Sequence, residues 1–138
     1  MTQTAGANLY DRVGGPPTFV RLVDAFYAGV AQDAELRALY PEEDLTAANV
    51  RLRMFLEQYW GGPHTYSEQR GHPRLRMRHV PFTIGDEERE HWVRAMDEAL
   101  EETLPEAPLD SDLRDEVGVR MREYFEMAAT AMVNQAAR

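Results

Sequence analysis

The chain has 138 residues, the size of one ordinary domain, and a composition of 43% hydrophobic and 28% charged residues, typical of a globular protein. It contains no cysteine, which excludes disulfides, thiolate metal sites and cysteine nucleophiles. The net charge of −9 opposes binding to nucleic acid or to an anionic membrane. With neither a signal peptide nor a stretch of about 20 apolar residues that could span a bilayer, we expect a cytoplasmic protein.

One short segment departs from this acidic character. Residues 70–79 contain four arginines, Arg70, Arg74, Arg76 and Arg78, and no acidic residue. A positive region of this size on an acidic protein favours a small anionic ligand over a polymer.

The first half of the chain predicts two long helices and one short one. Pro16 and Pro17 suit the first turn of a helix, and a short helical turn over 33–39 ends before Pro41. A second long helix is predicted from Thr46, as its N-cap, to the breaker Gly61-Gly62-Pro63. The apolar stripes at helical spacing are Phe19, Leu22, Val23, Phe26, Tyr27 and Val30 in the first helix, and Ala48, Leu52, Phe55, Leu56 and Tyr59 in the second.

The second half predicts two more long helices. Residues 61–72 read as a polar loop, and Pro73 begins a short helix that ends near His79. Asp86 is the predicted cap of a long helix that Pro105 ends, and Asp110 or Ser111 opens the last one. No strand is predicted. The fold class is therefore all-α, in a single domain over 1–138 with loose tails at 1–8 and 135–138.

The four histidines are the candidates for metal ligation. His64 is expected to be solvated in its loop, and His91 to face outward because it lies roughly 100° around its helix from Trp92. Glu88 and His91 form a Glu-x-x-His pair, but a di-iron bundle needs a second such pair, which the other histidines do not supply. His79, between arginines and an apolar segment, is either a structural residue or a ligand.

Three amphipathic aromatic residues lie on or beside the predicted apolar stripes. The hydroxyls of Tyr27 and Tyr40 and the indole N–H of Trp92 each need a polar partner if they are buried. Either they form three separate backbone hydrogen bonds, or they converge on one polar ligand in an apolar pocket. Periodicity alone leaves both alternatives open.

Longer motifs resemble one known family. Residues 51–63 (RLRMFLEQYWGGP) and 66–79 (YSEQRGHPRLRMRH) resemble the group II truncated haemoglobins. Residues 9–15 (LYDRVGG), followed by Phe26-Tyr27, Leu39-Tyr40-Pro41, Pro81-Phe82 and Trp92, match the same family in order and spacing. The resemblance extends from about Leu9 to Asn134.

The resemblance implies a globin-like two-over-two helical sandwich that encloses one haem b. His79 falls on the proximal iron-binding position of a pentacoordinate iron, and Tyr27, Tyr40 and Trp92 fall on the polar distal positions. Ala48 occupies the place of the distal histidine of many globins, with Leu52 one helical turn further on. The residues expected to line the haem slot are Phe55, Leu56, Met77, Phe82 and Met96, and those expected to hold the propionates are Arg76, Arg78 and Tyr66.

Three functions follow as alternatives. The first is binding of O₂, CO, NO and other small ligands with slow O₂ release, which favours scavenging or redox chemistry over bulk transport. The second is a haem-dependent NO dioxygenase or peroxidase-like enzyme, which predicts a reductase partner. The third is a haem-free helical interaction protein. Each of the three functions is compatible with self-association into a homo-oligomer through an apolar face.

Overall fold

The computed structural model describes residues 9–40, 43–70 and 84–133, and all of its regular structure in these ranges is helical. The helices are α1 (Leu9–Arg12), α2 (Pro16–Gln32), α3 (Ala34–Arg37), α4 (Thr46–Tyr59), α5 (Thr65–Arg70), α7 (Asp86–Thr103) and α8 (Ser111–Met132), with a 3₁₀ turn at Leu104–Glu106. The predicted all-α class is confirmed. The predicted tails and the predicted helix over 73–79 lie outside the described ranges.

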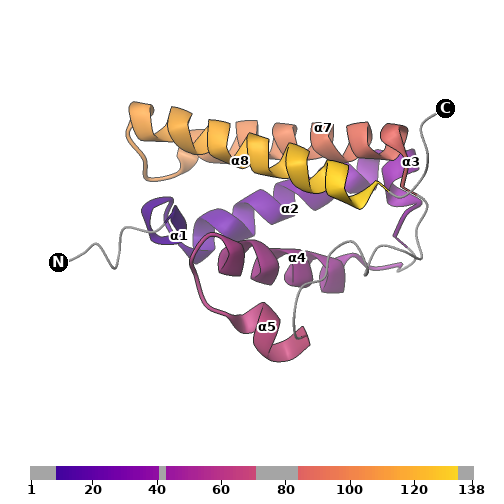
Figure 1. Cartoon of the computed structure of the whole chain (residues 1–138), viewed down its shortest axis with the longest axis horizontal. Helices are drawn as coiled ribbons and strands as arrows, with labels where there is room; N and C mark the ends of the chain where they lie inside the picture. Colours follow the sequence, from indigo (N-terminus) through magenta and orange to yellow (C-terminus); the bar gives the residue numbers. More distant parts are fainter. Residues whose placement is uncertain (1–8, 41–42, 71–83, 134–138) are drawn as a thin grey trace.

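Two helix pairs form the body of the molecule. Helices α7 and α8 lie side by side in one layer, and α2 and α4 lie in the layer beneath them (Figure 1). Helix α2 packs against both α4 and α7 and therefore joins the layers. This is the two-over-two arrangement that the resemblance implies. None of the helices described here is long and apolar enough to cross a membrane.

The predicted apolar stripe of α2 forms the centre of the core. All six of its residues are buried, and the α7 residues Met96 and Leu100 are completely enclosed with them. In α8, Val117, Met121 and Phe125 are buried as well. Removing apolar surface from water contributes about 25 cal/mol per Å², so the packing of α2 against α7 and α4 makes a large contribution to stability.

Two predicted helix caps are wrong by one residue. Thr46 is the first helical residue of α4, and its backbone N–H and hydroxyl both donate to Asp44, at 2.8 and 2.6 Å. The cap of α7 is Gly85, whose N–H donates to the Glu88 carboxylate at 2.8 Å. In both cases a neighbouring acid satisfies an N–H at the helix start. The cap of α8 is Asp110, one of the two predicted.

The predicted loop over 61–72 is also corrected, because it contains α5. Tyr66 is the buried residue of this short helix, so no stripe of apolar residues at helical spacing marks the helix in the sequence. Its position depends on α4: the Gln58 side chain donates to the Ser67 hydroxyl at 2.7 Å and accepts from the Ser67 N–H at 3.0 Å. Tertiary contacts of this kind leave no periodic signal in the sequence.

The predicted end of α4 is confirmed, and two glycines make it. The Gly62 N–H donates to the Glu57 carbonyl at 2.7 Å and the Gly61 N–H to the Gln58 carbonyl at 3.2 Å. Gly61 has φ of 106°. These are the two hydrogen bonds of a Schellman motif, with glycine in the left-handed position. The chain thereby turns sharply and brings Trp60 into contact with α1, where its carbonyl accepts from the Tyr10 N–H at 2.9 Å.

Two glycine-to-alanine substitutions are expected to change stability in opposite directions. A Cβ at Gly62 would lie 2.7 Å from the Tyr10 ring and 2.8 Å from the Glu57 carbonyl oxygen, whereas one at Gly29 would meet Ala95 at 3.7 Å. Gly62→Ala should therefore lower the free energy of unfolding by about 1–3 kcal/mol. Gly29→Ala, inside α2, should raise it by about 0.5–1 kcal/mol. Urea unfolding measures both, and equal effects would contradict the crowding at Gly62.

Candidate functional site

Two of the three polar aromatic residues are in direct contact. Tyr27, in α2, is buried, and its ring packs edge-on against that of Tyr40 with centroids 5.7 Å apart. Its hydroxyl donates to the Ala48 carbonyl at 3.4 Å, a long and therefore weak bond. Helices α2 and α4 and the segment after α3 thus meet at this tyrosine pair.

The third polar aromatic residue joins the same group through Phe26. The Phe26 ring lies 4.9 Å from that of Tyr27 and 5.5 Å from that of Trp92, both edge-on. Trp92, in α7, also contacts Phe125 of α8 at 5.9 Å. Tyr27, Tyr40, Phe26 and Trp92, named here the distal aromatic cluster, are therefore contiguous although they come from three separate parts of the chain.

The predicted haem-contacting residues divide into half-buried and enclosed ones. Ala48 is buried beneath Tyr27, and Leu56 and Met96 are fully enclosed in the core. Leu52 and Phe55 are half-buried on α4 and pack against the edge of the core. The Phe55 ring meets that of buried Tyr66 edge-on at 5.6 Å. The remaining predicted residues, Arg76, Met77, Arg78, His79 and Phe82, lie outside the described ranges.

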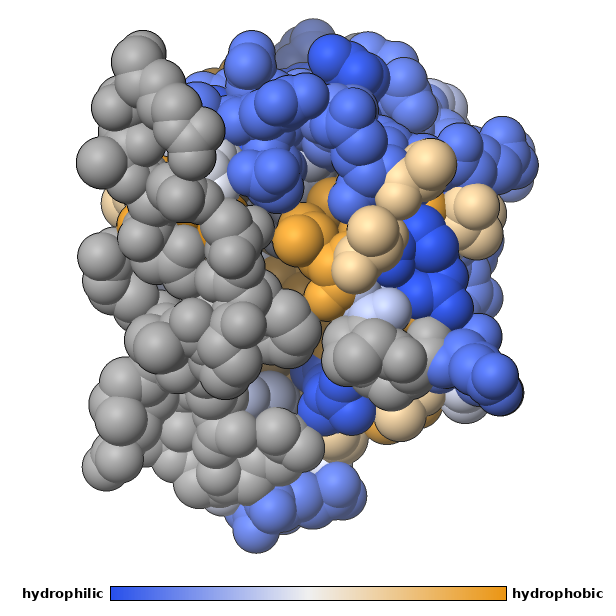
Figure 2. Space-filling view, turned by 90° about the vertical axis from the view of Figure 1, so that its right-hand side faces the viewer, coloured by the Kyte–Doolittle hydropathy of each residue, from blue (hydrophilic) through white to orange (hydrophobic). Residues whose placement is uncertain are grey.

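The described residues fit the chemistry of a haem. Haem is a flat apolar disc, and α4 carries the half-buried Leu52 and Phe55 as well as Ala48, whose carbonyl accepts from the Tyr27 hydroxyl. Figure 2 shows hydrophobic residues near the centre of the face at the α3 end of the molecule, with hydrophilic ones above and to the right of them. An apolar surface with a few polar hydrogen-bonding groups at its edge is typical of cofactor sites.

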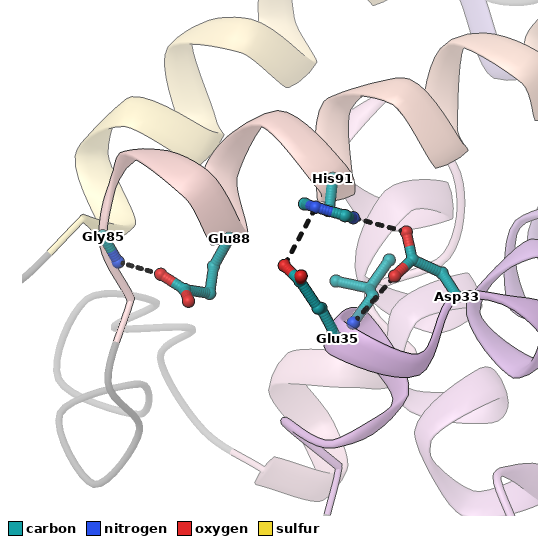
Figure 3. Close-up of polar contacts among 6 residues, drawn as sticks. Asp33, Glu35, Gly85, Glu88 and His91 are labelled. Atoms are coloured by element: carbon teal, nitrogen blue, oxygen red, sulfur yellow. Dashed lines mark hydrogen bonds and ion pairs between the residues drawn. The ribbon is translucent and has the colours of Figure 1, made fainter.

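A second candidate site, made of ionisable side chains, lies between α3 and α7. The His91 ring contacts two carboxylates, with Nδ1 2.6 Å from Asp33 and Nε2 3.0 Å from Glu35 (Figure 3). The hydrogen bond with Asp33 raises the pKa of His91, and the same bond lowers the pKa of Asp33. Since both ring nitrogens face carboxylates, each is placed to donate a proton.

The expectation that His91 faces outward is therefore wrong. The side chain is only 21% exposed, because the rotation of about 100° from Trp92 directs it over α3 rather than into solvent. Sequence reasoning assigned no role to Asp33, Glu35 or Glu87. The signal that could have found them is a pair of acids at the start of one predicted helix facing a histidine in the first turns of another.

Burial is the main cause of the pKa shifts of three other ionisable groups. Burial raises the pKa of Tyr124, whose ring lies 4.1 Å from that of Tyr59. Burial also raises the pKa of Asp97, and together with Glu57 it raises the pKa of Tyr10. These groups pack among core residues and do not converge on one point, so we assign them a structural role.

Comparison with known proteins identifies the class. The model of the bacterial-like globin family matches residues 8–130. The thermostable haemoglobin of the actinobacterium Thermobifida fusca is 51% identical and superposes with a TM-score of 0.86, over 94% of this chain and 99% of that one. The truncated oxygen-avid haemoglobin of Bacillus subtilis is 35% identical with a TM-score of 0.76, over 92% and 99%. The molecule therefore has the all-α globin fold.

A curated relative narrows this class. The chain is 37% identical over 121 residues to group 2 truncated hemoglobin YjbI of Bacillus subtilis. This match covers 88% of this chain and 85% of the relative. The chain belongs to the truncated haemoglobins, group II, within the bacterial-like globin family. Its cofactor is haem b, as in globins of this family, so the haem-free alternative is not retained.

Proposed function

We propose that this protein binds O₂, and also CO and NO, at a pentacoordinate haem b held by His79, with Tyr27, Tyr40 and Trp92 surrounding the ligand. The observation that carries the proposal is the contiguous distal aromatic cluster, in which Tyr27 meets Tyr40 at 5.7 Å and Phe26 joins Tyr27 to Trp92. When bound, the haem supplies an iron with an open position for a diatomic ligand.

The chain's own residues would retain that ligand. Tyr27 and Trp92 carry hydrogen-bond donors on apolar rings, and in an apolar pocket such donors stabilise a polar ligand. The bond from the Tyr27 hydroxyl to the Ala48 carbonyl is 3.4 Å long, so exchanging it for a bond to a ligand costs little. Each well-aligned donor contributes about 0.5–3 kcal/mol, and neighbouring donors do not add fully.

These hydrogen-bond donors predict slow dissociation of O₂ from the haem. A stabilisation of about 1.4 kcal/mol slows dissociation roughly tenfold if the association rate is unchanged. The structural relative from Bacillus subtilis described as oxygen-avid supports the same expectation. We therefore propose O₂ scavenging or redox chemistry in the cytoplasm rather than bulk transport, because transport needs rapid unloading.

A peroxidase-like activity or NO dioxygenation is the second candidate. The observation that favours it is the ring contact between Tyr27 and Tyr40, two oxidisable side chains in the proposed pocket. Sustained NO turnover would require a reductase that returns the haem to its reduced state. Self-association into a homo-oligomer is a separate possibility that the sequence leaves open. Sedimentation of the haem-loaded protein measures it.

Spectra and rapid mixing test the proposal. The purified protein is expected to show a Soret band that shifts when CO is added after reduction, and to bind O₂ reversibly. Stopped-flow mixing of the oxygenated protein with NO, and a peroxide-driven oxidation assay compared with free haem, separate binding from catalysis. Turnover above that of free haem would favour the enzyme, and reversible binding without such turnover favours the binding protein.

A further inference from the structure

The junction of α3 and α7 holds three metal-ligating side chains from two helices. Glu35 comes from α3, and Glu87 and His91 come from the first turns of α7. One potential ligand atom from each of these residues lies within 4.8 Å of the others. None of them belongs to the distal aromatic cluster.

The His91 ring is already oriented as in known metal sites. Asp33 accepts from Nδ1 at 2.6 Å, and Asp33 is itself held by the Leu36 N–H, at 3.1 Å from its other carboxylate oxygen. Histidines that bind metals commonly donate their second ring N–H to a carboxylate in this way. The arrangement leaves Nε2 directed at the Glu35 carboxylate, 3.0 Å away (Figure 3).

The charge around His91 also favours a cation. Glu35 and Glu87 each place a carboxylate oxygen within 4.8 Å of a His91 ring nitrogen, and Asp33 adds a third carboxylate. The positive charges facing them are the His91 ring itself and Arg94, which lies on the same helix. Glu35 and Glu87 are both exposed and accessible to a cation from solvent.

We propose that Glu35, Glu87 and His91 bind one divalent transition-metal ion, with Zn²⁺ as the representative, and that Asp33 positions the His91 ring. An imidazole nitrogen selects Zn²⁺ and similar ions over Mg²⁺ and Ca²⁺, which prefer oxygen ligands alone. A water molecule completes a tetrahedral set. On binding, the metal takes the place of the proton on Nε2, and that proton is released to solvent.

Such an ion would join α3 to α7. These helices lead to the distal aromatic cluster, because Trp92 follows His91 in α7 and Arg37 of α3 donates to the Tyr40 carbonyl at 2.9 Å. An ion that binds the folded chain alone raises its apparent stability by mass action. The proposal therefore predicts a higher melting temperature of the haem-loaded protein in the presence of Zn²⁺.

Calorimetric titration of the haem-loaded, chelator-treated protein with zinc chloride at pH 7.5 tests this site. We expect saturable binding of one Zn²⁺ per chain, and a loss of affinity of at least tenfold in His91→Gln and in Glu87→Gln. Glu90→Gln, an exposed residue of the same helix, and His64→Gln, an exposed histidine elsewhere, are the matched controls and should bind as the parent does.

Three results would overturn the proposal. These are the absence of saturable Zn²⁺ binding by the parent protein, unchanged affinity in both His91→Gln and Glu87→Gln, and an equal loss in His64→Gln. The Soret band and circular dichroism of each variant show whether it is folded. Glu87 is exposed, so its variant reports on the site even if His91→Gln weakens the packing of α3 on α7.

Discussion

Replacing His79 by glycine is expected to abolish stable haem binding, and imidazole added to the buffer is expected to restore it. The proposed function places the only bond from the chain to the iron at this imidazole, and apolar contacts alone hold a haem much less firmly than contacts plus a coordinate bond. The Soret absorbance of the purified variant, with and without imidazole, measures the effect. We expect near-complete loss of the bound pigment without imidazole.

The other histidines provide the controls for this substitution. His64 is exposed and His91 is occupied by Asp33 and Glu35, so His64→Ala and His91→Gln should retain the haem spectrum. His72→Ala tests the remaining histidine. An unchanged spectrum in His79→Gly, or loss of the spectrum in His72→Ala instead, would show that the iron ligand has been assigned to the wrong residue.

Trp92→Phe is expected to raise the O₂ dissociation rate by a factor between several-fold and about 100. The phenyl ring retains the packing against Phe26 and Phe125 but removes the indole N–H. Loss of one donor worth about 1–3 kcal/mol corresponds to this range of rates. Stopped-flow replacement of O₂ by CO measures the rate directly. Tyr27→Phe should act in the same direction, because it removes only the hydroxyl.

Trp60→Phe is the matched control for this change. Trp60 is also buried, and its indole N–H has no hydrogen-bond partner within the described part of the chain. Among the described residues, its ring packs against Tyr59 and Tyr124 and not against the rings of the distal aromatic cluster. The control should lose some stability and keep its O₂ dissociation rate. If Trp92→Phe left that rate unchanged as well, Trp92 would not contact the ligand.

The long helices could be predicted because their signals are local. Apolar residues at helical spacing, with Pro16, Pro17 and the Gly61-Gly62 pair at the ends, determine where α2 and α4 form. Predicted caps at Thr46 and Asp86 were displaced by one residue, since acids such as Asp44 and Glu88 can satisfy the helix start from either side. Helix α5 was not predicted, because hydrogen bonds to α4 hold it in place and no stripe of apolar residues marks it in the sequence.

The sequence by itself determined the long helices, the absence of thiol chemistry and, through long motifs, the family and its haem. Only the tertiary structure decided which side chains meet. Tyr27 bonds to Ala48, 21 residues away, and His91 to Asp33, 58 residues away. Helical periodicity shows which face of a helix a residue occupies, but the neighbour opposite that face depends on how the helices pack. For His91 that neighbour is an acidic pair on α3 instead of water, which is the basis of the proposed metal site.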